Sequence, residues 1–226
     1  MTAPFLRAMT AGLCAASVCI AMQGCAFLAS PKPDIEKSVL NELPVAVPHR
    51  ESARGTVLVF PPATMPVYDT VLMAYRTEPR QIAYFGRREW GATPSQMIQP
   101  LVVATLEKTR AFRVVLVPPY TGAYEYSLNT QVLDLIQDFT TNSATLVLSL
   151  RFQLLGHGAS GIIAARDISV REPMLQRNSQ AGVMAANDAT AKALQQMAEF
   201  VLQSTEPDAK SRSSASHQSR EASSSE

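Results

Sequence analysis

Cysteine and histidine are scarce in this sequence of 226 residues, and their positions exclude several kinds of site. All of the cysteines lie within the first 25 residues, at Cys14, Cys19 and Cys25. The rest of the chain therefore holds no disulfide and no zinc site built from cysteine. The histidines lack the spacing of metal ligands, at His49, His157 and His217. We expect no metal centre.

An excess of charge of one sign is also lacking. The chain carries 20 basic and 19 acidic side chains, which gives a formal net charge of +1 at pH 7. A protein that binds nucleic acid needs a basic surface to neutralise phosphates. We therefore expect no nucleic-acid partner.

The sequence motifs of catalysis and cofactor binding are missing as well. No Gly-x-Ser-x-Gly elbow occurs. Asp134 and Asp138 lie on one predicted strand at a separation of about 13 Å, which is too far for two carboxylates that act on one bond. Gly156-His-Gly-Ala-Ser-Gly161 matches G-x-G-x-x-G, but the residues after it alternate like a strand. A dinucleotide site requires a helix there, so we interpret this segment as a hairpin loop and expect no cofactor.

The longest apolar run is short and lies near the N-terminus. It extends from Ala8 to Met22 after a single charge at Arg7, and about 20 residues would be needed to span a bilayer. A positive start, a short apolar middle and a small residue at the end are typical of a secretory signal. Ala21-Met-Gln-Gly-Cys-Ala26 resembles a bacterial lipobox, although Met22 and Gln23 depart from its preferred residues. We expect a signal peptide over 1–24 and a lipid, with palmitate, on Cys25; an ordinary cleaved signal and an uncleaved anchor are the alternatives.

Composition divides the remaining chain into three parts. Residues 25–55 contain prolines and little periodicity, which predicts a tether, while an edge segment lying on the domain is the alternative. Within this part, 35–43 favours a short turn of helix. Residues 56–204 have the patterns of one folded domain, and the serine-rich residues 205–226 predict a disordered tail.

Periodicity within the domain predicts its elements. Short strands are expected at 56–60, 71–77, 81–85 and 113–117, and longer ones at 126–139, 144–155 and 161–171. The alternation in 126–139 changes phase near Val132, which predicts a bulge. Thr93, Pro94 and Gln96 form the start signal of a helix, and a second, amphipathic helix is expected at 182–203. The order predicts an α+β fold: a mostly antiparallel twisted sheet with two helices packed on one face.

Aromatic residues concentrate in one part of the domain. Six of the fifteen lie between Phe60 and Trp90. Neighbours on a strand point to opposite faces, so Tyr84 and Phe85 cannot both enter one core. Aromatic side chains are enriched at interfaces, which favours a partner-binding role for four residues: Tyr75, Tyr84, Phe85 and Trp90. Packing in the core is the alternative for each ring.

Several segments resemble the ABC-type transport auxiliary lipoprotein family. They are Met73–Arg76, Gln81–Trp90, Thr93–Met97, Pro100–Val102, Leu106–Phe112, Gln137–Phe139 and Gly182–Asn187. The resemblance implies an outer-membrane lipoprotein at the periplasmic face, held by its lipid anchor. It also implies a non-catalytic role beside an MCE-type lipid transporter, which has a permease, an ATPase and a substrate-binding MCE protein. The MCE protein, or further copies of this chain in a ring, would be its partner. The alternative is an exported enzyme acting on lipid or cell wall.

Overall fold

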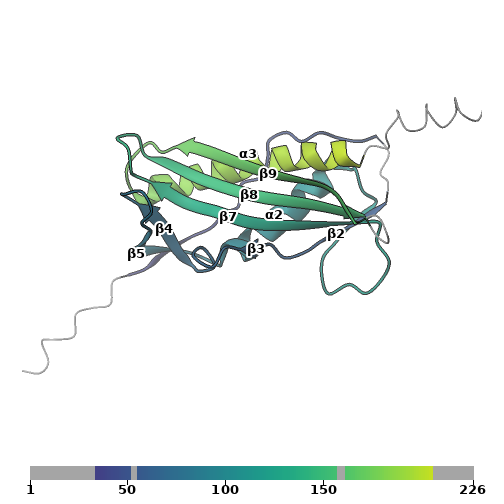
Figure 1. Cartoon of the computed structure of the whole chain (residues 1–226), viewed down its shortest axis with the longest axis horizontal. Coiled ribbons are helices and arrows are strands. Elements are labelled where there is room, and N and C mark those ends of the chain that lie inside the picture. The colour runs from purple at the N-terminus through teal and green to yellow at the C-terminus, as the bar shows by residue number, and fades with distance from the viewer. Residues whose placement is uncertain (1–33, 52–54, 157–160, 206–226) are drawn as a thin grey trace, which may run out of the picture. The chain divides into compact units, whose positions relative to one another are not determined.

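The computed structural model describes residues 34–51, 55–156 and 161–205 (Figure 1). From Ile35 onward these residues belong to one compact unit. The predicted signal segment, Cys25, residues 157–160 with His157, and residues 206–226 lie outside the described part.

Three long strands form the main body of the sheet (Figure 1). They are β7 (Tyr126–Asp138), β8 (Thr145–Gly156) and β9 (Ile162–Pro173), paired antiparallel in that order. Every second residue of β8 from Leu146 to Leu154 is buried, as the alternation predicted. The register of β7 against β8 shifts between Val132 and Asp134, which confirms the bulge.

Three short strands cover the other edge of β7 one after another, each parallel to it. They are β2 (Thr56–Val59), β3 (Ala63–Thr64) and β4 (Leu72–Arg76). Pro61-Pro62 separates β2 from β3, because a proline has no backbone N–H to donate to the neighbouring strand.

The remaining strands extend this short-stranded side. The predicted hairpin is present, since β5 (Ala83–Trp90) pairs antiparallel with β4. Parallel to β2 lies β6 (Val114–Leu116), and β1 (Glu36–Ser38) runs parallel to β5. Within the described chain, all nine strands join one sheet.

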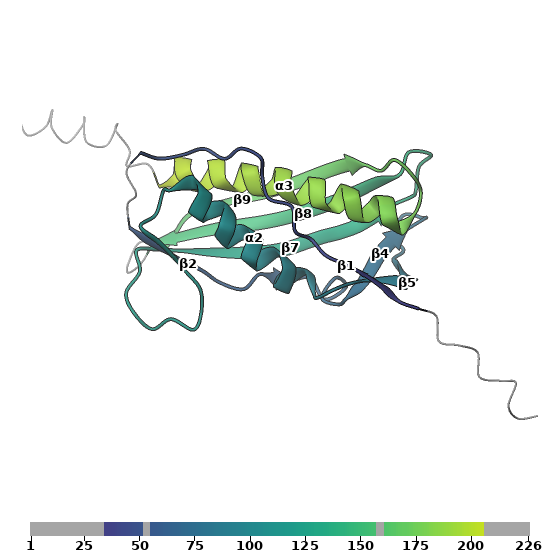
Figure 2. The same cartoon turned by 180° about the vertical axis from the view of Figure 1, so that it is seen from behind.

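Two helices cover one face of the sheet (Figure 2). They are α2 (Pro94–Thr109) and α3 (Ser179–Ser204). The predicted start of α2 is confirmed, with Gln96 Oε1 accepting from the Thr93 N–H at 3.1 Å. At the start of α3, the Asn178 side chain accepts from the Ala181 N–H at 2.8 Å. Neither helix is long and apolar enough to cross a membrane.

The main core lies between the helices and the sheet. Leu148, Leu150 and Phe152 of β8 meet Leu194 and Met197 of α3 there, and all five are fully buried. Burial of this kind contributes about 2 kcal/mol or more for each large side chain. The expected α+β fold is therefore confirmed. We call the opposite face, which neither helix covers, the open face.

The chain before β2 differs from two sequence predictions. The expected turn of helix at 35–43 is wrong, because Glu36–Ser38 instead pairs with the outer edge of β5. Residues 35–51 are not a free tether either; we call them the strap. Leu40 of the strap is buried in the core, and the Arg50 N–H donates to Thr109 O at 3.0 Å. Figure 2 shows the strap crossing the helix layer. The alternative of an edge segment on the domain is the correct one for these residues.

Candidate interaction surface

Alternation along the strands determines which side chains occupy the open face. Leu148, Leu150 and Phe152 point to the helices, so Ser149, Arg151 and Gln153 point the other way. The open face has three distinct parts: an ionic cluster, an apolar patch and a polar hollow.

The ionic cluster joins the ends of β4 and β7. Arg76 Nη2 contacts Asp138 Oδ2 at 2.5 Å, and Asp138 Oδ1 accepts from the Thr140 N–H at 3.0 Å and its hydroxyl at 2.6 Å. The hydrogen bond from Arg76 is the main reason that the pKa of Asp138 lies well below 3.8. Nearby, the Tyr68 hydroxyl donates to Asp134 Oδ1 at 3.2 Å. Burial, and then the charge of Asp134, raise the pKa of Tyr68 to about 12.

Replacing Asp138 with asparagine should lower the free energy of unfolding by about 2 kcal/mol at pH 7, because Arg76 loses a charged partner. Because the pKa of Asp138 is lower in the folded than in the unfolded protein, its carboxylate stabilises the fold fully at pH values above the unfolded pKa of 3.8. This stabilisation is lost progressively as the pH falls from 3.8 toward the folded pKa. The difference between the two proteins in urea unfolding should therefore shrink below pH 4. Asp167→Asn is the matched control, because its pair with Arg151 is solvent-exposed and its loss should matter less. A difference that stays constant with pH would contradict this account.

The four aromatic residues predicted for partner binding do not share one surface. The ring centroids of Tyr75 and Phe85 lie 4.6 Å apart, and both rings pack against the ring of Phe139 on the core side. Trp90 is only 3% exposed. Trp90 thus lies in the core, and Tyr75 and Phe85 are half-buried and pack against it, as the core alternative expects; a partner-binding role for these three stays a prediction. Tyr84 is 38% exposed, as the alternation with Phe85 predicted for one member of the pair.

Exposed apolar side chains lie on the same hairpin as Tyr84 and in the turn before it. Leu72 of β4 and Ile82, just before β5, belong to the same hairpin and are both exposed. The Tyr84 hydroxyl donates to Val67 O at 2.9 Å, in the turn that begins at the exposed Met65. We call Met65, Leu72, Ile82 and Tyr84 the Tyr84 patch. Aromatic residues and methionine are enriched where partners bind, so this patch suits a protein contact.

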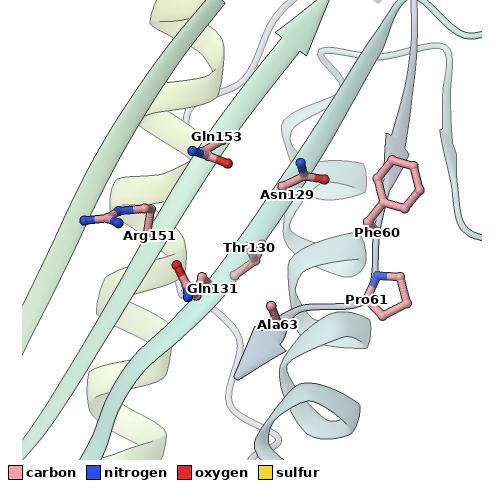
Figure 3. A pocket seen from close by; sticks show the side chains of 8 residues that line it. All are labelled: Phe60, Pro61, Ala63, Asn129, Thr130, Gln131, Arg151 and Gln153. Carbon is pink, nitrogen blue, oxygen red and sulfur yellow. The ribbon is translucent and has the colours of Figure 1, made fainter. Parts of the chain in front are cut away.

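The polar hollow lies where the neighbour of β7 changes from β2 to β3 (Figure 3). Its volume is about 430 Å³. The lining consists of Phe60, Pro61, Ala63, Asn129, Thr130, Gln131, Arg151 and Gln153. The sequence does not single out this group, because the group forms only through the pairing of β7 with β8. The sole signal was the polar phase of the alternation in 144–155.

Among the described side chains, no three of His, Cys, Asp and Glu gather closely enough to hold a metal ion. The glycine-rich segment does join two antiparallel strands, with the Gly156 N–H donating to Gly161 O at 3.0 Å. A strand follows it rather than a helix, so it lacks the geometry of a dinucleotide site.

Comparison with known proteins identifies the family. The sequence profile of the ABC-type transport auxiliary lipoprotein component matches residues 39–198. No curated protein sequence matches the chain. The crystal structure of XCC0632 from Xanthomonas campestris is similar, with a TM-score of 0.66 and 16% identity over 74% of this chain and 95% of that one. A crystal structure of an uncharacterized protein gives a TM-score of 0.59 and 14% identity, over 74% of this chain and 99% of that one.

These two likenesses show the fold, and the profile covers most of the folded unit. The chain belongs to the ABC-type transport auxiliary lipoprotein component family.

Proposed function

We propose that this lipoprotein is a non-catalytic auxiliary component of an MCE-type ABC lipid transport system. In this proposal Cys25 carries the lipid that anchors it to the outer membrane, and the domain faces the periplasm. The observation that carries the proposal is the family match over residues 39–198, which includes the strap residues after Ser38, strands β2 to β9, all of α2 and α3 as far as Ala198.

The ionic chemistry of the open face supports a role without catalysis. Strongly shifted pKa values mark candidate catalytic groups when a site uses them, but ion pairs that stabilise the fold shift them too. Asp138 is held by Arg76 and Thr140, and Tyr68 by Asp134. Each of these shifts has a structural cause. The alternative is an exported enzyme acting on lipid or cell wall. Such an enzyme would need a catalytic group, and in this cluster the shifted pKa values of Asp138 and Tyr68 are explained by contacts that hold the fold together.

Co-purification tests the proposal. The full-length lipoprotein is isolated from membranes in mild detergent through a C-terminal affinity tag, and its partners are identified by mass spectrometry. We expect an MCE protein, a permease and an ATPase in the eluate. A lipoprotein that elutes alone and hydrolyses phospholipid or peptidoglycan would instead establish the enzyme.

Tyr84→Ala tests whether the Tyr84 patch docks the MCE protein. Truncation of an aromatic side chain at an interface should weaken binding by at least about 1 kcal/mol, which is roughly fivefold. Folding should change little, because the ring is 38% exposed and its hydroxyl makes one hydrogen bond, to Val67 O. The measurements are a melting curve and a titration with the purified MCE protein.

Tyr120→Ala provides a matched control. Tyr120 is 40% exposed and its hydroxyl also donates to a backbone carbonyl, Ala123 O at 3.3 Å, but it lies in the loop after β6. Equal affinities of the two variants and the wild type for the MCE protein would show that the Tyr84 patch is not part of the interface.

The anchor is tested by labelling cells with a radioactive fatty acid. Cys25→Ala should abolish incorporation, because the variant lacks the thiol at the predicted lipidation site. Cys19→Ala is the matched control and should be labelled like the wild type, since Cys19 lies within that signal. A wild-type protein found unlabelled in the soluble periplasmic fraction would refute lipidation.

A further inference from the structure

The polar hollow of the open face is lined by side chains in a regular array. Asn129 is paired with Gln153 across β7 and β8, and Gln131 is paired with Arg151. Paired residues have Cβ atoms about 5 Å apart, and residues two apart on a strand are separated by about 7 Å. Four planar hydrogen-bonding groups therefore occupy the corners of a small rectangle (Figure 3).

The three amides of this array have no hydrogen-bond partner within the described part of the chain. Asn129, Gln131 and Gln153 are each half-buried, yet their side chains make no hydrogen bond to any described residue. Each amide offers a carbonyl acceptor and two N–H donors. Half-buried amides without partners are available to a ligand that both donates and accepts.

Arg151 keeps the hollow electrically balanced. Its Nε and Nη2 contact the two carboxylate oxygens of Asp167, both at 2.7 Å, which leaves Nη1 outside the pair. The bidentate contact fixes the plane of the guanidinium and cancels its charge locally. The array therefore suits an uncharged ligand better than a phosphate or a carboxylate.

Phe60 and Pro61 supply an apolar wall. They follow β2 and face the array across the hollow, next to Ala63 of β3 (Figure 3). The volume of about 430 Å³ is within the range of about 300–1,000 Å³ that holds small ligands. The ligand must therefore combine an apolar side with polar groups around its perimeter.

We propose that this hollow binds a neutral saccharide unit. A sugar ring carries hydroxyl groups around its edge, and each can donate to or accept from an amide, while its C–H face packs on an apolar wall. An acyl chain would leave the amides unpaired, at a cost of about 1–3 kcal/mol for each buried group. An extended peptide binds along the free edge of a strand, but β7 is paired with β8 throughout the hollow and with β2 and β3 on either side of it. Along the hollow, only Asn129 and Thr130 lack a strand partner on the other edge, and this gap is too short for an added strand.

Nuclear magnetic resonance of the isotopically labelled protein, lacking the predicted signal and lipid, tests this assignment. Chitotriose, a neutral trisaccharide, is titrated to about 10 mM, because single-site saccharide binding is detectable at millimolar dissociation constants. We expect shifts in the side-chain NH₂ signals of Asn129, Gln131 and Gln153. Inorganic phosphate and a blocked neutral tripeptide are titrated in parallel and should leave these signals in place.

A double variant, Gln131→Ala with Gln153→Ala, should weaken chitotriose binding at least about tenfold. Its backbone spectrum should remain that of a folded protein, since neither amide has a hydrogen-bond partner among the described residues. Gln196→Ala, an exposed glutamine on α3, is the matched control and should bind normally. The proposal is overturned if chitotriose shifts none of the three amide signals, if only phosphate or the tripeptide shifts them, or if a folded double variant binds like the wild type.

Discussion

Gly182→Val is expected to destabilise the domain by about 3 kcal/mol, through overpacking and the displacement of a buried amide. A Cβ at Gly182 would lie 2.1 Å from Gln137 Cδ and 2.2 Å from its Nε2. Gln137 is 1% exposed on the helix-facing side of β7, so its amide has no solvent to turn into. The backbone of Gly182 and the side chain of Gln137 meet here without space for a methyl group. The measurement is the urea midpoint of unfolding.

Removing the obstructing amide should reverse most of this loss. Gln137→Ala creates the space that the added valine needs, so the double variant Gln137→Ala, Gly182→Val should be more stable than the sum of the single changes predicts. Gly86→Val is the matched control, because a Cβ there meets no atom within 4 Å. Strictly additive effects of the two changes would show that the contact between Gly182 and Gln137 does not set the spacing of α3 from the sheet.

The contact between Gln137 and Gly182 shows why some of the fold could not be predicted from sequence. Both residues lie in segments that resemble the family, yet nothing in the sequence pairs them. Residue 182 was predicted as the start of the last helix, whereas α3 begins at Ser179 and contains the glycine in its first turn. The glycine is explained by a close approach to β7, which requires the tertiary structure.

Long elements, in which a pattern is repeated many times, were predicted well. Alternation over 126–139 and 144–155 identified β7 and β8, and the change of phase near Val132 located their bulge. The start signal at Thr93 located α2. These signals are local, since each one is repeated or completed within a few residues.

Pairings between short strands were not predictable in the same way. Two residues form β3 and three form β1, which is too few to show a period. Their positions follow from edges that other strands leave open, along β7 and β5 respectively. The polar hollow is likewise a product of this pairing, because it opens where β2 gives way to β3.

The candidate contact residues illustrate the same limit. The sequence showed that one of Tyr84 and Phe85 must face outward, and the structure identifies Tyr84. The sequence did not show that Phe139, more than fifty residues later, packs against Tyr75 and Phe85. A ring becomes a core residue through a partner that only the fold supplies.

Asn187→Ala is expected to release the strap from α3 and to lower the free energy of unfolding by about 2 kcal/mol. Asn187 Oδ1 accepts from the N–H groups of Asn41 at 2.8 Å and Glu42 at 3.2 Å, and its Nδ2 donates to Val39 O at 3.1 Å. One side chain that is 9% exposed thus satisfies three backbone groups of the strap. Without it those groups must find water or stay unpaired.

Hydrogen exchange separates this role from a general loss of stability. In Asn187→Ala the amides of Asn41 and Glu42 should exchange faster than those of the β7–β8 ladder, because local opening of the strap then precedes global unfolding. Asp188→Ala, at the exposed neighbouring position, should leave both amides protected. The strap lies between the predicted anchor at Cys25 and β2, so its release would move the point at which the anchored chain leaves the domain. Unchanged protection of Asn41 and Glu42 in the variant would mean that Leu40 and β1 hold the strap without Asn187.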